Sequence, residues 1–272
     1  MNSSLERLPI SVSLIARNES QTLPRCLESV VPWTREVVVV INDCTDQTAD
    51  VARSYNASVI EHPWAGFREQ KNFAAAQASQ LWVLAIDADE AVSAALREEI
   101  HAFFRGDHGR FAGASFPRKS WFLGRWITHG DWYPDRVLRL YRKDLGHWGG
   151  SAEHCTVELN GALKRFRSDL LHFSSPMIAD YLRKFPFYSE LYLQRQLEEG
   201  AGWSALPVIV RSAWRFVRAY VIRRGFLDGY PGFFIAASTA YGTLFRHTRL
   251  YEHQRTRPHH VSNQAFVDHQ HL

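Results

Sequence analysis

Four apolar segments alternate with amphipathic segments along the first hundred residues, and no other feature restricts the fold as strongly. The apolar segments, which we predict to be strands, span residues 10–16, 36–41, 57–61 and 81–86. Between and after them apolar residues recur at helical spacing, which predicts helices over 22–31, 46–55, 67–78 and from 93 onward. Strands that alternate with helices of this length indicate βαβ units and a mainly parallel sheet. We therefore predict an α/β fold for this part of the chain.

Three acidic residues directly follow the fourth predicted strand: Asp87, Asp89 and Glu90. The carboxyl ends of strands in an open α/β sheet meet at one edge, where ligands usually bind. The polar turns 17–20 and 42–48 should reach the same edge, where they suit the base and ribose of a nucleotide. Carboxylates at this D-x-D spacing point to one side and suit Mg²⁺ or Mn²⁺ on a diphosphate. The alternative is structural, because acids favour the start of a helix and Asp46 and Thr48 can cap another.

Other classes of site are not expected, because the sequence lacks their patterns. It has no G-x-G-x-x-G after its first strand and no G-x-x-x-x-G-K-[ST], which argues against dinucleotide and P-loop sites. Its three cysteines lie far apart and predict neither a disulfide framework nor a zinc knuckle. Since no apolar run reaches the roughly 18 residues of a spanning helix, we expect a cytoplasmic protein, soluble or peripheral at a membrane.

The character of the sequence changes twice after the first hundred residues. From about residue 111 it is aromatic and rich in Gly and Pro, which indicates short strands and functional loops, and from about 175 it is helical. Residues 201–258 contain nine arginines, no lysines and two acids. This pattern predicts a basic amphipathic helix on an anionic membrane surface, although a helix packed on the catalytic domain with solvated arginines also fits. Nucleic-acid binding is not expected, because there is no RNP-like motif and the D-x-D edge is acidic.

Several motifs occur in a fixed order along the chain. They are ARNE at 16–19, CTDQT at 44–48, WAGFREQKN at 64–72 and DADE at 87–90. Together they resemble the family-2 glycosyltransferases of the GT-A fold. Later segments resemble the branch that includes lipopolysaccharide-core glycosyltransferases, namely WYPDRVLRLYR at 132–142, HWGGSAEH at 147–154, LLHF at 170–173 and the segment 220–246. The resemblance covers roughly residues 8–250.

The resemblance implies a GT-A-type, Rossmann-like, mainly parallel sheet with an appended helical C-terminal region. We expect a GT-A catalytic domain over 1–174, with a nucleotide-binding half over 1–105 and an acceptor half over 106–174. A helical, basic, membrane-associating region is expected over 175–258, and a loose tail over 259–272.

The resemblance also implies a site for a nucleotide-diphosphate sugar donor, with UDP as the expected nucleotide. The residues that match the family's motifs there are Ala16, Arg17, Asn18, Glu19, Thr45, Asp46, Gln70, Lys71, Asn72, Asp87 and Ala88. The family usually has acids directly after strand two, whereas this chain has Asn42, whose amide can bond the edge of a uracil. The expected metal ion, Mg²⁺ or Mn²⁺, would bind Asp87 and Asp89, with His154 as a further ligand matched to a histidine of the branch.

Inverting transfer needs a carboxylate that acts as general base toward the acceptor hydroxyl. Asp135 of WYPD is the preferred candidate and Glu153 the rival, while a salt bridge from Asp135 to an arginine is the structural alternative. His172 stands between apolar residues and is expected to be buried and hydrogen-bonded. Candidates to add positive charge near the diphosphate are Lys71, Arg118, Arg136, Arg139 and Arg142.

With the resemblance, these features predict a metal-dependent, inverting glycosyltransferase. It would move a hexose from a UDP-sugar to a lipopolysaccharide core or another lipid-linked glycan acceptor. We expect a peripheral protein on the inner, cytoplasmic face of the bacterial inner membrane. Two alternatives stay open: a nucleotidyl- or phosphotransferase that uses the same metal edge, and a non-catalytic membrane-bound protein that binds a glycan or sugar nucleotide. The first would release pyrophosphate or phosphate, and the second would bind without turnover.

Overall fold

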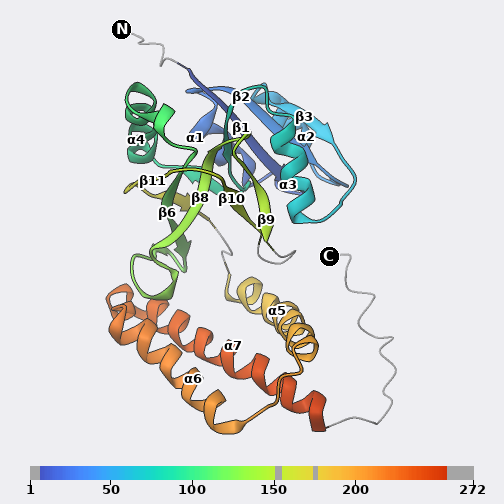
Figure 1. The fold of residues 1–272 in the computed structure, drawn as a ribbon, viewed down its shortest axis with the longest axis vertical. Helices are drawn as coiled ribbons and strands as arrows, with labels where there is room; N and C mark the ends of the chain where they lie inside the picture. Colours follow the sequence, from blue (N-terminus) through green and yellow to red (C-terminus); the bar gives the residue numbers. More distant parts are fainter. Residues whose placement is uncertain (1–6, 151–154, 174–176, 256–272) are drawn as a thin grey trace.

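The structure is a computed structural model that describes residues 7–150, 155–173 and 177–255. It consists of an α/β domain built on one large sheet and a helical region that follows it in the sequence (Figure 1). Neighbouring strands of the sheet follow the order β3-β2-β1-β4-β8-β6-β12-β5, and β7 and β11 also pair with β6. The predicted GT-A-type α/β architecture with an appended helical region is confirmed.

Four parallel strands form the half of the sheet that the sequence predicts most directly. They are β1 (Leu8–Ala16), β2 (Thr34–Ile41), β3 (Ser58–Glu61) and β4 (Trp82–Ala85). Strand β1 lies between β2 and β4, and β2 also pairs with β3. The helices of this half are α1 (Leu23–Val30), α2 (Thr48–Ser54), α3 (Phe67–Ala76) and α4 (Ala94–Arg105). Helix α4 begins after Ser93, whose hydroxyl accepts a hydrogen bond from Leu96 N at 3.1 Å.

Strand β2 illustrates why these strands are apolar at nearly every position. Side chains along a strand alternate between the two faces of the sheet. Val37 and Val39 belong to the core that includes residues of α1 and α4, whereas Val38 and Val40 pack with Ala74 of α3. Because helices cover both faces here, no position from Val37 to Ile41 can be polar without a buried partner.

The second half of the sheet is mixed and carries the chain from the first half to the helical region. Its strands are β5 (Glu90–Val92), β6 (Gly113–Phe122), β7 (Arg125–Trp126), β8 (Asp135–Arg142), β11 (Leu163–Arg165) and β12 (Leu170–His172). Strand β8 runs antiparallel to β4 and β6, so its first residues lie at the carboxyl end of β4. Short 3-10 helices, η1 (His108–Arg110) and η2 (Gly130–Trp132), interrupt the loops. Strands β9 (Gly146–Gly150) and β10 (Cys155–Leu159) form a separate antiparallel pair.

Strand β5 was not among the strands expected from the sequence. The segment after Asp87 was expected only as the entry to a helix, but Glu90 to Val92 pair antiparallel with β12. Three residues are too short for a periodicity to be recognised, and the partner strand lies about 80 residues later in the chain. The pairing fixes Asp89 and Glu90 beside His172, at the end of β12.

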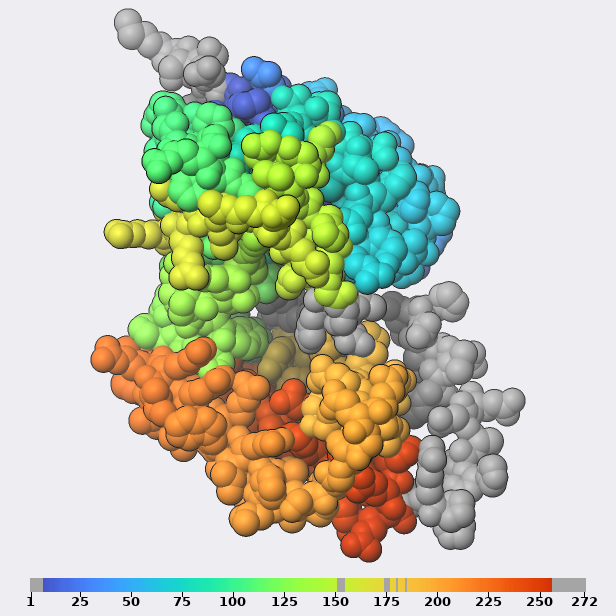
Figure 2. Space-filling model, viewed as in Figure 1, coloured from blue at the N-terminus to red at the C-terminus, as the bar shows by residue number. Residues whose placement is uncertain are grey.

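The helical region consists of α5 (Ile178–Glu198), α6 (Ala205–Val217) and α7 (Gly229–Arg255), with the π-helical turn η3 (Arg218–Ile222) and the 3-10 turn η4 (Gly225–Asp228) between the last two. Helix α7 packs against both α5 and α6. In Figure 2 this region, orange to red, meets the sheet domain at the green segment around β6, β7 and η2. Within the described ranges, no helix has an apolar stretch that would be long enough to cross a membrane.

Two carboxylates form polar contacts between the helical region and the sheet domain. Asp228 is fully buried and accepts hydrogen bonds from the backbone N–H groups of Thr128 (3.0 Å) and His129 (2.8 Å). Asp131 of η2 forms an ion pair with Arg218 at 2.6 Å, and Arg223 lies 3.4 Å from its other oxygen. These polar contacts therefore fix the loop before β8 relative to the helices.

Candidate functional site

The candidate site lies at the edge of the sheet where β1, β2 and β4 end. Ala16 and Ala88 are buried at this edge, and Asn42, the first residue after β2, is 5% exposed. Asn18 and Asp43 have positive φ angles of 55° and 43°, so both turns bend sharply after their strands. The sequence-based prediction that these turns reach one edge is confirmed by the parallel register of β1 with β2 and β4.

The turns after β1 and β2 are joined by hydrogen bonds. The bonds run from Thr45 N to Asn18 Oδ1 (2.8 Å), from Glu19 N to Thr48 Oγ1 (2.8 Å) and from Ser20 N to Asp46 Oδ2 (3.1 Å). Asp46 also accepts from Thr48 N at 2.9 Å, and the hydrogen bond from the Thr48 hydroxyl holds the pKa of Asp46 well below its ordinary value. Asn18 and Asp46 therefore hold the two turns together. The structural alternative concerned Asp46 and Thr48 as helix caps, and Asp46 does contact Thr48, the first residue of α2. Arg17 is exposed at the same place.

Asp87 lies at the centre of an ion network. Its Oδ1 is 2.6 Å from Lys71 Nζ of α3, and its Oδ2 is 2.5 Å from a guanidinium nitrogen of Arg139 of β8. Burial alone would raise the pKa of Asp87, but the charges of Arg139 and Lys71 outweigh burial and lower the pKa far below its ordinary value. Asp87 is thus a permanently charged carboxylate with both oxygens already in ion pairs.

Glu90 extends the network to the next strands. Its side chain is fully buried, and its Oε1 lies 3.2 Å from Arg139 and 3.1 Å from Arg118 of β6. Its other oxygen accepts a hydrogen bond from Asp87 N at 3.0 Å, which closes the turn between β4 and β5. Arg118 continues to Asp135, whose Oδ2 lies 2.6 Å from one guanidinium nitrogen and 2.9 Å from Nε. One chain of alternating charges therefore runs from Lys71 to Asp135.

Asp89 points away from this network and faces His172. Its Oδ2 is 3.3 Å from His172 Nε2, while the Nδ1 of the same ring is 3.1 Å from Ser120 Oγ. His172 was expected to be buried and hydrogen-bonded: it is hydrogen-bonded, but it is only partly buried, with a side chain that is 16% exposed. Its position beside the D-x-D motif results from the pairing of β12 with β5, which sets His172 opposite Glu90 and which the sequence pattern did not indicate.

The acids of the edge also act on Glu19. Burial raises the pKa of the Glu19 carboxyl, and the negative charges of Asp89, Asp46 and Asp87 raise it further, against a hydrogen bond from Thr22. Glu19 therefore belongs to the same electrostatic environment as the D-x-D motif, which agrees with its predicted place at the site.

Lys71 is the residue of the Q-K-N run that points to the ion network. The buried Gln70 bonds to His62, with its Oε1 3.0 Å from Nδ1 and its Nε2 3.1 Å from the backbone oxygen. Asn72 bonds to the backbone of Trp148 through both of its amide atoms, each at 2.9 Å. Both amides thus hold neighbouring segments in place, and Lys71 Nζ lies 4.4 Å from the centre of the Trp148 ring.

Two predicted site residues, Glu153 and His154, lie outside the described residues. Among the described ranges, no group of three or more His, Cys, Asp or Glu side chains is arranged to hold a metal ion. A pair is present, Asp89 with His172, and a bound donor could add phosphate oxygens to it. Of the other arginines proposed to add charge, Arg136 bonds to the backbone of Phe166 at 3.0 Å and Arg142 to Asp144 at 2.6 Å, away from the acids.

Comparisons with known proteins identify the family of the chain. Residues 11–167 match the family model of "Glycosyl transferase family 2". An uncharacterized glycosyltransferase of Rickettsia prowazekii is 30% identical over 256 residues, which cover 89% of this chain and 86% of the relative. The lipopolysaccharide core biosynthesis glycosyltransferase LpsC of Rhizobium meliloti is 29% identical over 255 residues, 91% of this chain and 94% of the relative. Among solved structures, S. aureus TarS 1-349 in complex with UDP-GlcNAc is 14% identical with a TM-score of 0.49, over 89% of this chain and 84% of that one.

The ion pairs of Asp87 predict a defined pH dependence of stability. Because its pKa is lowered in the folded state, its contribution is complete above the unfolded pKa of about 3.9 and is lost as the pH falls below that value. Asp87→Asn should lower the free energy of unfolding at pH 7 by on the order of 2 kcal/mol, because Arg139 loses a partner. It should also flatten the decrease between about pH 5 and pH 2. Urea denaturation across this range measures both effects.

Asp50→Asn is the matched control, because Asp50 pairs with Arg53 on the exposed surface of α2. Its curve should follow that of the wild type within about 0.5 kcal/mol. If the curves of Asp87→Asn and the wild type ran parallel below pH 5, the pKa of Asp87 would not be lowered and the ion network would be wrong.

Proposed function

Because the chain belongs to glycosyl transferase family 2, we propose that it transfers a hexose from a UDP-sugar to a lipid-linked glycan. The observation that carries the proposal is the edge at which Asp89 faces His172 beside the ion-paired Asp87. The proposed acceptor is a lipopolysaccharide core, supported by the name of the Rhizobium meliloti relative. Family membership favours glycosyl transfer over transfer of a nucleotidyl or phosphoryl group, and over binding without turnover.

The divalent metal, Mg²⁺ or Mn²⁺, is assigned to Asp89 and His172. Adjacent ligands of an octahedral ion with bonds of about 2.1 Å lie about 3 Å apart, and the two side-chain atoms are 3.3 Å apart. The contact of Nδ1 with Ser120 leaves Nε2 as the ligand atom, in the manner of metal-binding histidines. Asp87, predicted as a ligand, has both oxygens in ion pairs. We assign it the role of positioning the turn that carries Asp89.

The residues around the pair suit a departing diphosphate. The metal would supply Lewis-acid stabilisation of the negative charge that develops on the leaving group. Lys71 and the exposed Arg17 add positive charge at the same edge. The buried Asn42 supplies an amide for the base. The chain's own contribution is therefore to hold the diphosphate among fixed charges that need no rearrangement.

Asp135 is the proposed general base. It is the first residue of β8, and Arg118 connects it to Glu90, which places it at the edge that carries the acids. Both of its bonds to Arg118 use Oδ2, and among the described residues no hydrogen bond occupies Oδ1. At 43% side-chain exposure, it can be reached by an acceptor hydroxyl. Arg118 would keep the carboxylate oriented.

The metal assignment is tested by nucleotide binding. In isothermal titration calorimetry, UDP should bind the wild type in Mn²⁺ at least about tenfold more tightly than in EDTA. Asp89→Asn and His172→Ala should each remove most of this difference, because each deletes one ligand. His253→Ala is the control, since His253 lies in the last turn of α7, outside the sheet domain that carries the acids. Metal-dependent UDP binding that survives in both ligand variants would refute the assignment.

The general base is tested by turnover, measured as UDP release from UDP-glucose with lipopolysaccharide extract as acceptor. Asp135→Asn should lower kcat by about 10²–10⁴-fold, the usual contribution of a positioned base. Its UDP affinity in Mn²⁺ should change less than about threefold. Glu153→Gln is the comparison. If Glu153→Gln loses turnover and Asp135→Asn keeps it, the roles of the two residues are reversed.

We also propose that α6 and the turns after it bind an anionic membrane surface. The apolar face of α6 is directed outward: Leu206, Ile209, Val210 and Trp214 are 71%, 59%, 56% and 53% exposed. Further exposed apolar residues continue this face through η3 and η4, namely Val217, Val221, Ile222, Phe226, Leu227 and Tyr230. So many exposed apolar side chains in one segment are unusual on a protein surface that meets only water.

The arginines of the same segment complete the argument. Arg215 and Arg218 of α6 and η3 turn inward to Asp131, opposite to what a water-facing helix requires. Arg211 and Arg224 are exposed in the same segment, where they can contact lipid phosphates. The alternative in which the arginines of α6 are simply solvated does not account for the outward apolar face. The lipid interface accounts for both features.

Vesicle cosedimentation tests this surface. Vesicles with about 30% phosphatidylglycerol should bind the wild type, and the double variant Ile209→Glu, Trp214→Glu should lose at least about tenfold in partitioning, because two apolar side chains no longer enter the interface. Leu163→Glu is the matched control, since Leu163 is 40% exposed on β11 of the sheet domain. Equal loss in the control, or absence of binding by the wild type, would contradict the proposal.

A further inference from the structure

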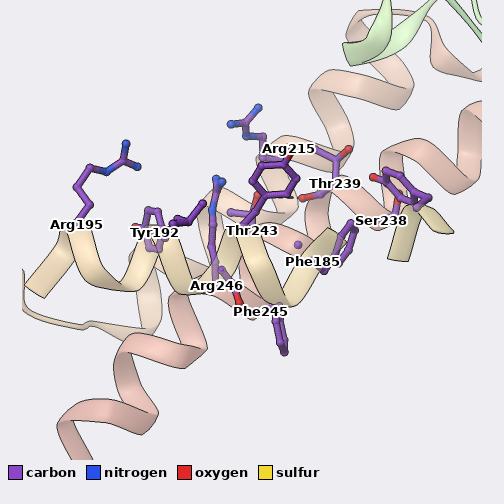
Figure 3. A pocket seen from close by; sticks show the side chains of 14 residues that line it. Phe185, Tyr192, Arg195, Arg215, Ser238, Thr239, Thr243, Phe245 and Arg246 are labelled. Atoms are coloured by element: carbon purple, nitrogen blue, oxygen red, sulfur yellow. Dashed lines mark hydrogen bonds between the residues drawn. The ribbon is translucent and has the colours of Figure 1, made fainter. Parts of the chain in front are cut away.

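A pocket of about 320 Å³ lies between α5 and α7, away from the nucleotide edge (Figure 3). Aromatic side chains of α5 form one wall, and small residues of α7, such as Ser238 and Gly242, form the other. Three arginines reach it from three helices: Arg195 of α5, Arg215 of α6 and Arg246 of α7. The pocket thus combines an apolar, aromatic lining with a cluster of positive charge.

The three guanidinium groups have little negative charge around them. In the described part of the chain, no carboxylate lies within ion-pair distance of Arg195 or Arg246, and both instead approach the Tyr192 ring, at 5.7 Å and 5.1 Å. Arg215 is 3.7 Å from Asp131, a carboxylate that Arg218 already binds at 2.6 Å. By contrast Arg249, one turn further along α7, pairs with Glu190 at 2.7 Å.

Arg246 differs from Arg249 in having no carboxylate partner among the described residues, although the Nε of each lacks a hydrogen bond. Its Nε is buried and, within the described structure, has no hydrogen-bond partner. Burial lowers the pKa of Arg246, and the positive charges of Arg215 and Arg195 lower it further. Like charges held together in a partly buried space repel one another unless an anion lies among them. The arrangement therefore calls for a negatively charged group in the pocket.

The lining indicates what that group is attached to. Guanidinium groups bind phosphate through paired, charge-assisted hydrogen bonds. Tyr188 and Phe185 offer apolar ring surface beside them, which suits a hydrocarbon chain and not a free ion. A volume of 320 Å³ accommodates a phosphate with the first carbons of its substituent. We propose that this pocket binds the phosphate group of a phosphorylated lipid.

The inference deepens the proposed function, because it rests on the membrane association of the helical region and adds a specific lipid site to it. Figure 3 shows Arg246 between Tyr192 of α5 and Arg215 of α6. A lipid phosphate held there would be bound by all three helices at once. The apolar face of α6 would bind the membrane without selecting a lipid, and the pocket would select lipids that carry an accessible phosphate.

The test uses dodecyl phosphate below its micelle concentration, titrated into the full chain by calorimetry. Dodecyl phosphate should bind at least about tenfold more tightly than either inorganic phosphate or dodecyl maltoside, which share only the head group or only the chain. Arg246→Gln should weaken its binding by about 10-fold or more, as expected for a lost charge-assisted hydrogen bond. Arg195→Gln, an exposed position that should fold normally, should weaken it at least about threefold.

Arg249→Gln is the matched control, because it removes the same charge from α7 outside the pocket and should change the affinity less than about twofold. The membrane-face variant Ile209→Glu, Trp214→Glu should still bind dodecyl phosphate, which separates failure of the pocket from failure of the surface. Equal binding of inorganic phosphate would show a free-anion site and overturn the proposal. So would equal binding of dodecyl maltoside, or equal losses in Arg246→Gln and Arg249→Gln.

Discussion

The ion pairs of Arg139 with Asp87 and Glu90 hold together the two halves of the sheet. Arg139 projects from β8, Asp87 follows β4 and Glu90 is the first residue of β5, so Arg139 joins the end of the parallel half to a strand of the mixed half. The Arg139 side chain is 7% exposed and that of Glu90 is fully buried, so neither charge has water as a substitute partner. The turn that carries the D-x-D motif therefore has one conformation, and the orientation of Asp89 depends on it.

The two aspartates of the motif therefore have different surroundings. Asp87 has Lys71 and Arg139 on its two oxygens, whereas Asp89 faces only a histidine that Ser120 orients. A carboxylate with both oxygens in ion pairs is a poor ligand, because a metal would have to displace a cation from it. A carboxylate beside an oriented imidazole is a good one. The motif thus holds Asp87 within the ion network and leaves Asp89 outside it, beside His172.

The sequence predicted the parallel half well because its signals are local. Val37 to Ile41 are apolar at every position since helices cover both faces, and Asp87 follows β4 within two residues. What the sequence did not predict depends on contacts between distant segments. Strand β5 exists only through β12, His172 reaches Asp89 through the same pairing, and the ion partners of Asp87 come from α3 and β8. A basic amphipathic pattern predicted α6, but periodicity cannot tell which face of a helix points outward.

The outward direction of the apolar face of α6 has a consequence for the loop before Asp135. Its inward arginines bind Asp131 in η2, only four residues before Asp135, and Asp228 fixes the segment directly before η2. The loop from Asp131 to Asp135 is therefore held at one end by the helical region and at the other end by the sheet. Apolar residues on α6 could be buried against its neighbours only if Arg215 and Arg218 turned out and released Asp131. The outward apolar face of α6 and the order of the loop from Asp131 to Asp135 therefore both depend on the rotation of α6 about its axis.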